Sequence, residues 1–281
     1  MTSASSRTSF DSSGKNWGDR IIRPTDRDLP GLKFNFLKNA IDKNTRRVLE
    51  VGCSGGRHLG SLQTVESDRR YVGCDIDVHS AKTGKEAHPE IDFIAGDGLQ
   101  LPFQDETFDA VYFMDYLEHV EGPDIAVSEI VRTLKKGGVL SAYIPCEGNR
   151  WTMYRAFSWV FGFNVKKPAA GHVQSFSDKQ VIALLSQQHL EVTKVRYSYH
   201  LFGHSGDFLL FLFVFLSKKV AKMWWSGNKY YHNESKRPKS FAVRIFNLLL
   251  STANFIAYLE SRIFHRVRFF SAGIHVNCTK L

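Results

Sequence analysis

The chain has 281 residues, of which 43% are hydrophobic, so it is long enough to bury a full α/β core. Its four cysteines, Cys53, Cys74, Cys146 and Cys278, form no C-x-x-C pair, which excludes a sequence-local zinc or disulfide framework and is typical of a reducing cytoplasm. The net charge is +9. Residues 1–199 hold 25 basic and 25 acidic residues, whereas 200–281 hold 12 and 3, so the whole excess lies in the last third.

The first sixteen residues are rich in Ser and Thr and have no apolar core. This composition predicts a disordered tail over 1–16 and no secretion signal. We therefore expect a cytoplasmic protein.

A glycine-rich turn follows the strand-like run Arg47-Val48-Leu49 and continues as Glu50-Val51-Gly52-Cys53-Ser54-Gly55-Gly56-Arg57-His58. The segment 59–65 that follows has helical periodicity, so the pattern predicts a strand, a tight loop and a helix start whose backbone amides can approach a ligand. A nicotinamide or flavin fingerprint needs G-x-G-x-x-G, and Ser54 breaks that spacing. A nicotinamide-dependent reductase is thereby disfavoured but stays an alternative.

Acidic residues recur at the ends of the next strand-like runs. Tyr71–Asp77 carries Asp75, and Ile91–Gly98 carries Asp97. A carboxylate at the end of such a strand can accept hydrogen bonds from both ribose hydroxyls of a nucleoside. The run Thr107–Phe113 predicts a fourth strand.

In this order the motifs resemble those of the class I S-adenosylmethionine-dependent methyltransferases. Their first motif, E/D-x-G-x-G-x-G, is present with Ser in place of the middle glycine, and the resemblance covers roughly Lys33 to Arg196. It implies a Rossmann-like seven-stranded sheet with helices on both faces, and S-adenosylmethionine as cofactor. It also implies a set of cofactor-binding residues, with the residue at Asp97 contacting the adenine amino group: Glu50, Gly52, Cys53, Ser54, Gly56, Asp75, Ile76, Asp97, Gly98 and Asp115.

Further elements follow from periodicity and end signals. We expect helices over Leu32–Ile41, over 124–136 with Gly137-Gly138 as its stop and Ile125 facing inward, and from Ser177 onward. Strands are expected over Val139–Ile144 and Leu190–Tyr199. The family topology requires one last antiparallel strand, which we assign to Ala272–Cys278.

The run Met114-Asp115-Tyr116-Leu117-Glu118-His119 follows the fourth strand. His119 is a general-base candidate by residue type and position. The run also resembles the E-x-x-E-H element of the ubiquinone-biosynthesis O-methyltransferases, which implies a divalent metal on Asp115, Glu118 and His119. Asp-x-x-Glu is also the pattern of a helix capping box. We favour that interpretation, so no metal site is assigned.

The aromatic-rich segment 151–163 also resembles a segment of these O-methyltransferases. In that family the segment lies over the acceptor pocket. His172 follows it and is the second base candidate. A structural hydrogen bond that fixes the loop before the Ser177 helix is an equally good interpretation of His172.

Residues 200–270 have no counterpart in that family. They contain the apolar run 207–216, the basic and tryptophan-bearing run 217–225, and the segment Phe241–Phe270, in which apolar residues alternate with arginines. The apolar part of 207–216 is about half the ~20 residues that span a bilayer. Such segments indicate helices at a membrane interface, while packing on the sheet or in a dimer remains the alternative. The density of Phe and Leu argues against nucleic acid.

We therefore expect four parts: a tail (1–16), a methyltransferase core (17–199), a basic amphipathic helical insertion (200–270) and the final strand of the core (271–281). The predicted function is methylation, on oxygen, of an amphipathic or lipid-linked small molecule. The predicted location is the cytoplasm, with peripheral membrane contact through 207–270 at the inner face. The alternative is a non-catalytic, cofactor-binding adaptor for a membrane or protein partner.

Overall fold

The computed structural model describes residues 20–230 and 239–281, so the predicted tail lies outside the described residues. A seven-stranded sheet forms the centre of the molecule, in the order β3-β2-β1-β4-β5-β7-β6. Its strands are β1 (Arg47–Val51), β2 (Arg70–Asp75), β3 (Asp92–Ala95), β4 (Phe108–Met114), β5 (Leu134–Pro145), β6 (Leu190–Ser198) and β7 (Gly273–Lys280). β7 is antiparallel to β5 and β6, while the pairs among β1 to β5 are parallel, which confirms the predicted sheet and its last strand.

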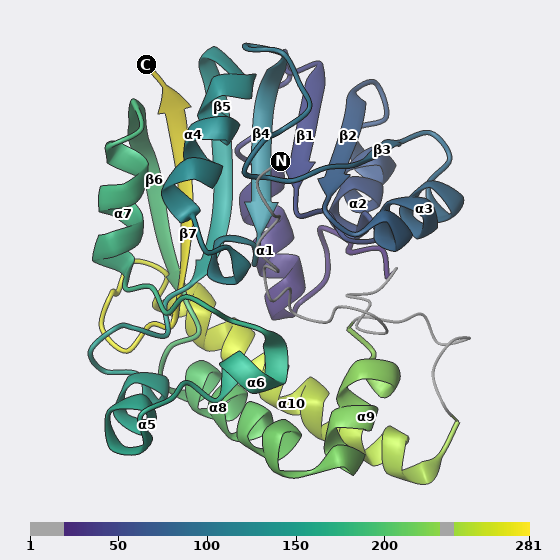
Figure 1. Ribbon diagram of the computed structural model, residues 1–281. Coiled ribbons are helices and arrows are strands. Elements are labelled where there is room, and N and C mark those ends of the chain that lie inside the picture. Colours follow the sequence, from purple (N-terminus) through teal and green to yellow (C-terminus); the bar gives the residue numbers. More distant parts are fainter. Residues whose placement is uncertain (1–19, 231–238) are drawn as a thin grey trace, which may run out of the picture.

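Helices cover both faces of the sheet (Figure 1). They are α1 (Leu29–Lys38), α2 (Arg57–Val65), α3 (Val78–Ala87), α4 (Pro123–Thr133) and α7 (Asp178–Ser186). Alternate strand residues point to opposite faces. Leu49 and Val111 therefore pack with α4 and α7, whereas Val48 and Ala110 pack with α1 and α2.

The remaining helices lie beyond the carboxyl ends of the parallel strands, where Figure 1 shows them as a lower layer. A one-turn helix, η1 (Leu117–His119), follows β4, and α5 (Met153–Phe161) and α6 (Lys166–Ala170) follow β5. Between β6 and β7 lie α8 (Leu201–Leu216), α9 (Lys218–Gly227) and α10 (Phe241–Ile263). We call these last three helices the helical lobe.

Two predicted helices have different ends from those expected. α1 begins at Leu29 because Asp28 caps it by accepting a hydrogen bond from the Gly31 amide, and it ends at Lys38. α4 ends at Thr133, so the two glycines at 137–138 lie inside β5 and do not stop the helix. Ile125, expected to face inward, is 51% exposed. The Gln180 side chain completes a capping box with Ser177, which begins α7 as predicted.

Helix α10 is, among the described helices, the one that is long and apolar enough to cross a membrane by length and composition. Helices α8 and α9 would pass the same test together, but they meet at a bend of 118°. α10 packs against α8, α9 and α1 on one side only, and 22% of its most apolar stretch is buried. Much of its apolar surface therefore faces outward.

Candidate active site

The glycine-rich turn between β1 and α2 has the backbone that a close ligand approach requires. Gly52 and Gly56 have φ angles of 70° and 75°, and Ser54, which replaces the middle glycine of the motif, keeps a φ of 46°. This left-handed region favours glycine, so Ser54 carries some strain. A Cβ on Gly56 would lie 2.3 Å from the Phe93 ring, so glycine is required there on two grounds.

Asp75 lies at the carboxyl end of β2, as predicted for the ribose anchor. One carboxylate oxygen accepts a hydrogen bond of 2.7 Å from the Ser54 amide, and the other accepts one of 3.0 Å from the Asp77 amide. Burial raises the pKa of Asp75, and these amide hydrogen bonds partly offset the shift. The carboxylate is thus fixed beside the turn, next to Ile76, which is 72% exposed.

Glu50 is buried beneath the turn. One of its carboxylate oxygens lies 3.0 Å from His58 Nδ1, and the other accepts a hydrogen bond of 3.1 Å from the Tyr112 hydroxyl. Burial raises the pKa of Glu50 and lowers that of His58 to about 3, so both side chains favour their neutral forms. With both oxygens engaged, Glu50 ties the start of α2 to β4, a supporting role for the turn.

The sequence analysis missed Tyr116, whose ring bridges two predicted cofactor loops. A Cβ on Gly52 would lie 2.6 Å from this ring, and one on Gly98 would lie 1.9 Å from its hydroxyl oxygen. A side chain at position 98 would clash with Tyr116, so glycine is required there. Next to it, the Asp97 carboxylate accepts a hydrogen bond from the Leu99 amide; β3 ends at Ala95, so Asp97 lies in the loop two residues beyond the strand that was predicted to end with it. Cys53 is buried beside Gly73.

The predicted capping box at 115–118 is wrong. Tyr116, not Asp115, occupies the N-cap position of η1, and no side chain caps that helix. Asp115, with a φ of 51°, instead forms an ion pair with Lys33 of α1, 2.8 Å from its Nζ. Burial raises the pKa of Asp115, but Lys33 outweighs this and the net pKa is lowered. The amine of Lys33 also lies 3.5 Å from the centre of the Tyr143 ring.

The two predicted histidines are brought together by the fold. The rings of His119, on η1, and His172, after α6, are 4.9 Å apart and nearly perpendicular. His119 Nδ1 lies 3.1 Å from the Gly171 carbonyl oxygen. Burial and the neighbouring His172 lower the pKa of His119 to about 4, so it is neutral near pH 7. These two imidazoles come from segments 53 positions apart in the sequence.

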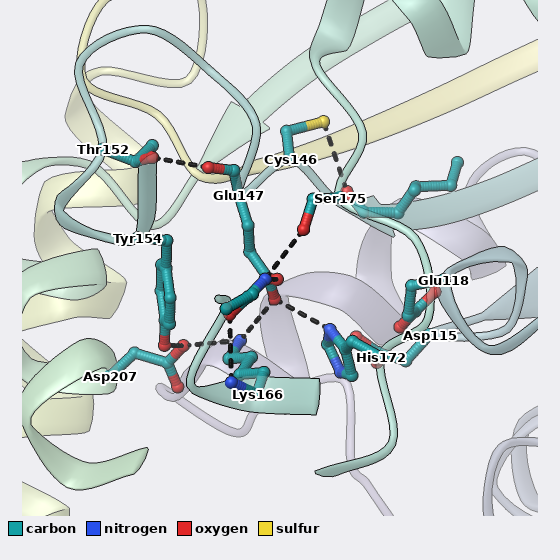
Figure 2. Close-up of polar contacts among 12 residues, drawn as sticks. Asp115, Glu118, Cys146, Glu147, Thr152, Tyr154, Lys166, His172, Ser175 and Asp207 are labelled. Atoms are coloured by element: carbon teal, nitrogen blue, oxygen red, sulfur yellow. Dashed lines mark hydrogen bonds and ion pairs between the residues drawn. The ribbon is translucent and has the colours of Figure 1, made fainter. Parts of the chain in front are cut away.

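Glu147, which the sequence analysis also missed, orients His172 (Figure 2). The Glu147 carboxylate lies 2.8 Å from His172 Nδ1 and 3.1 Å from Lys166 Nζ, and it accepts a hydrogen bond from the Asn164 amide. Burial raises the pKa of Glu147, but His172 and Lys166 outweigh it and lower the net pKa well below its usual value. The sequence did hold a signal for Glu147: it is an acidic residue just after a buried strand, the same pattern that identified Asp75.

The network continues from Lys166 to the helical lobe. Lys166 Nζ lies 2.8 Å from the Asp207 carboxylate of α8, which accepts a hydrogen bond of 2.7 Å from the Tyr154 hydroxyl. Burial lowers the pKa of Lys166, but Asp207 and Glu147 outweigh it and the net pKa is raised. Figure 2 shows this chain of charges running from His172 to Asp207. It joins the segments that follow β5 to α8.

Glu118 lies beside the two histidines and is 1% exposed. Neither of its carboxylate oxygens has a hydrogen-bond partner, and one lies 3.8 Å from His119 Nε2. Burial and the nearby Asp115 raise its pKa well above the usual value. One donor atom from each of Glu118, His119 and His172 lies within 4.8 Å of the others, a spacing that fits a divalent cation.

A cavity of about 480 Å³ lies between these groups and the helical lobe. Its polar end is formed by Lys33, Asp115, His119, Lys166, His172 and Asp207. Its apolar end is formed by helical-lobe residues, among them Leu210, Phe211, Trp224, Phe246, Leu249 and Leu250. The cavity is thus polar beside the sheet and apolar away from it.

Comparison with known proteins agrees with the fold and the motifs. Residues 49–142 match the methyltransferase domain family. The chain is 33% identical to a demethylmenaquinone methyltransferase of Streptomyces griseus over 145 residues, 50% of this chain and 61% of that protein. It is 34% identical to one of Corynebacterium kroppenstedtii over 188 residues, 57% of this chain and 81% of that protein.

Two more distant likenesses extend this set. A phthiotriol/phenolphthiotriol dimycocerosates methyltransferase of Mycobacterium ulcerans is 32% identical over 102 residues, 36% of this chain and 38% of that protein. The solved structure of geranyl diphosphate C-methyltransferase from Streptomyces coelicolor has the same fold, with a TM-score of 0.54 and 12% identity over 90% of this chain and 78% of that one. The chain spans about three fifths of the S. griseus relative. It belongs to the family of S-adenosylmethionine-dependent methyltransferases.

Proposed function

We propose that the protein transfers the methyl group of S-adenosylmethionine to an oxygen of an amphipathic or lipid-linked small molecule. The observation that carries this proposal is the cavity, which joins a polar end at the sheet to an apolar end in the helical lobe. Pockets of this size and character bury an apolar ligand while a few polar groups fix its orientation. The relatives are named for demethylmenaquinone and for phthiotriol dimycocerosates, which agrees with a quinone or lipid-like acceptor.

The cofactor would be held by the turn after β1 and by the strand-end acids. In this proposal Asp75 binds the ribose hydroxyls, Asp97 the adenine amino group, and Gly52, Cys53, Ser54, Gly56, Ile76 and Gly98 line the nucleoside. Glu50 supports the turn from below. Asp115, which follows β4 and lines the acceptor cavity, would contact the methionine end of the cofactor.

Methyl transfer is an in-line displacement. The acceptor oxygen forms a bond to the methyl carbon, the carbon–sulfur bond breaks, and S-adenosylhomocysteine leaves with the electron pair on sulfur. The proton of the acceptor hydroxyl passes to His172 Nε2. Glu147, at 2.8 Å from Nδ1, holds that ring in the tautomer that can accept this proton and stabilises the imidazolium that results. His119 packs against this ring and helps to orient it.

A divalent cation is the second candidate for activating the acceptor. The observation that favours it is Glu118, a buried carboxylate without a hydrogen-bond partner that faces two imidazoles. Glu118, His119 and His172 would hold the ion, and a bound cation would acidify the acceptor hydroxyl. Addition of Mg²⁺ or Mn²⁺ to protein treated with a chelator separates the two: rate recovery favours the cation, and an unchanged rate favours His172 as base.

We also propose that the helical lobe contacts a membrane surface. Its outward side chains are apolar, with Phe241 78%, Leu248 62% and Ile256 46% exposed. Lys218, Lys219 and Lys222 of α9 and Arg244 of α10 are exposed beside them. Apolar faces flanked by basic residues suit the interface of an anionic bilayer. A protein partner that covers the same face is the alternative outcome.

The acceptor class is tested with methyl-labelled S-adenosylmethionine, purified protein and an extract of the host cell. Label that partitions into the organic phase only when the protein is present supports a lipid-like acceptor. Label confined to the aqueous phase contradicts that class but leaves methyl transfer intact. Binding of S-adenosylhomocysteine with no labelled product in any fraction would instead favour a cofactor-binding adaptor.

A further inference from the structure

A second cavity, of about 570 Å³, lies apart from the acceptor cavity and shares no lining residue with it. Three loop or helix-start segments form it, together with Arg155 of α5: the loop after β5, the start of α7, and the loop between α10 and β7. In Figure 1 these segments meet at the lower end of α7. No step of the proposed methyl transfer uses this place.

The lining of this cavity carries one sign of charge. Four basic side chains contribute to it, and no acidic one does: Arg150, Arg155, Lys179 and Arg268. The buried Asp178 lies next to the cavity, and both of its oxygens bind Arg268. None of the ion pairs among residues 20–230 and 239–281 involves the other three. Within the part of the chain that the structure describes, these three basic side chains therefore have no ion-pair partner.

The three segments are joined by partly buried side-chain hydrogen bonds and by one backbone hydrogen bond. Asn149 donates a hydrogen bond of 2.9 Å to the Ser271 carbonyl oxygen and accepts one of 2.9 Å from the Asp178 amide. The Gly148 amide donates to the Phe176 carbonyl oxygen, and a Cβ on Gly148 would lie 2.5 Å from the Ser175 carbonyl oxygen. The cavity is therefore preformed, so a ligand meets its basic groups without first ordering a loop.

The rim of the cavity is aromatic. The Trp151 and Phe269 rings are 5.3 Å apart, each residue is 50% exposed, and the Arg150 guanidinium lies 5.2 Å from the Trp151 ring centre. Helix α5 runs on from this rim and exposes Trp159 by 86% and Phe161 by 61%. Tryptophan with arginine beside exposed apolar side chains is the composition of a membrane interface, where rings lie at headgroup depth.

We infer that this cavity binds the phosphate of an anionic phospholipid headgroup while α5 and the aromatic rim rest among the lipid chains. Arginine and lysine recognise phosphate through charge-assisted hydrogen bonds. A water-soluble phosphate would account for the basic lining, but it would leave the exposed apolar rim without a role. The inference rests on the proposed membrane contact, and it adds a defined lipid site outside the helical lobe.

The test compares binding to phosphatidylcholine vesicles with and without phosphatidylglycerol, measured by co-sedimentation. The variant is Arg150→Glu/Arg155→Glu/Lys179→Glu. The matched control is Lys43→Glu/Arg46→Glu/Lys82→Glu, which reverses three exposed basic residues that line neither cavity. Since each basic residue near an anionic surface contributes about tenfold or less in affinity, we expect the first variant to lose on the order of 100-fold and the control to lose far less.

Binding of S-adenosylhomocysteine, unchanged in both variants, shows that the fold is kept. Equal loss in variant and control, or none in either, overturns the headgroup site. Free inorganic phosphate that binds the unaltered protein but not the variant, with no preference for phosphatidylglycerol vesicles, overturns the lipid assignment. If Phe241→Ser/Leu248→Ser abolishes vesicle binding while the cavity variant keeps it, the proposed membrane contact stands and the headgroup site fails.

Discussion

The central strands and the helical lobe are both rich in apolar residues, but the lobe buries only some of them and leaves many others exposed. Val111 and Phe113 of β4 are 0% exposed because helices cover both faces of the sheet. Leu248 and Leu249 of α10 are 62% and 65% exposed because that helix is packed on one side only. Hydrophobicity along the chain is therefore no measure of burial, and the exposed part is the one available for a ligand or partner.

The two regions also use charge differently. Around the sheet, buried charges form a connected set in which Asp115 meets Lys33, and Glu147 meets His172 and Lys166. In the helical lobe the exposed lysines of α9 have no acidic residue within their own helix. The first region fixes groups for chemistry, and the second presents an excess of positive charge.

The largest effect is expected from Asp75→Ala. It removes the carboxylate predicted to accept both ribose hydrogen bonds, and charge-assisted bonds contribute about 1.5–3 kcal/mol each, so affinity for S-adenosylhomocysteine should fall on the order of 100-fold or more. Asp92→Ala, which removes an acid that pairs with Arg70 at the surface, is the control. Calorimetric titration measures both. Retained affinity in the Asp75 variant would contradict its role as ribose anchor.

Glu147→Gln tests the catalytic edge of the sheet. The amide keeps the shape but loses the charge that orients His172 and neutralises Lys166, so we expect kcat to fall roughly 10- to 100-fold with a smaller change in KM for the cofactor. A shift of the kcat–pH profile separates this role from a merely structural one. Glu121→Gln, an exposed carboxylate nearby in the sequence, should leave kcat unaltered. An unchanged kcat in the Glu147 variant would contradict the proposed role of His172 as the base.

Phe113→Ala and the pair Phe241→Ser/Leu248→Ser test the difference between buried and exposed apolar residues directly. Loss of a fully buried Phe should lower the free energy of unfolding by about 3–5 kcal/mol. The two serines should change it by less than about 1 kcal/mol, because surface substitutions are close to neutral, yet weaken vesicle binding. Urea denaturation and co-sedimentation measure the two effects. Strong destabilisation by the serines would mean that α10 is covered, by a second copy or a partner.

The smallest effect concerns His58, whose pKa is about 3 in the folded state against an ordinary value of 6.5. Because the unfolded chain takes up this proton first, His58 costs stability as the pH falls below 6.5 and this cost grows down to about 3. His58→Gln keeps a hydrogen-bond donor for Glu50 but does not titrate. The free energy of unfolding of this variant, relative to that of the unaltered protein, should therefore rise as the solution is acidified. Urea denaturation at several pH values measures this difference. A pH-independent difference would contradict a buried neutral His58.

Local motifs were enough to predict the glycine-rich turn and the strand-end acids proposed to hold the cofactor. The turn at 50–58 and the acids Asp75 and Asp97 are each set by a strand end and the loop that follows it, so they appear as contiguous patterns. The polar end of the acceptor cavity was predicted only in part. His119 and His172 were identified as separate candidates, but nothing in the sequence pairs Glu147 with His172 or Lys33 with Asp115.

The failed capping box illustrates the reason. Asp-x-x-Glu has the spacing of a cap, and no local feature contradicts it, yet α1 places Lys33 beside Asp115 and removes that carboxylate from the helix start. An ion pair formed across 82 positions can override a local hydrogen bond, because burial strengthens the attraction between opposite charges. The helix ends at Lys38 and Thr133 shifted for a similar reason, since tertiary packing decides where a short helix stops.

The sequence by itself determined the sheet, the order of its motifs and the basic, apolar character of the last third, because alternating burial, strand-end acids and charge are local properties of the chain. Only the tertiary structure decided which charges meet, which apolar faces stay exposed and where the two cavities lie. These depend on contacts between segments far apart in the sequence, and their energies arise from burial that no single segment can achieve alone.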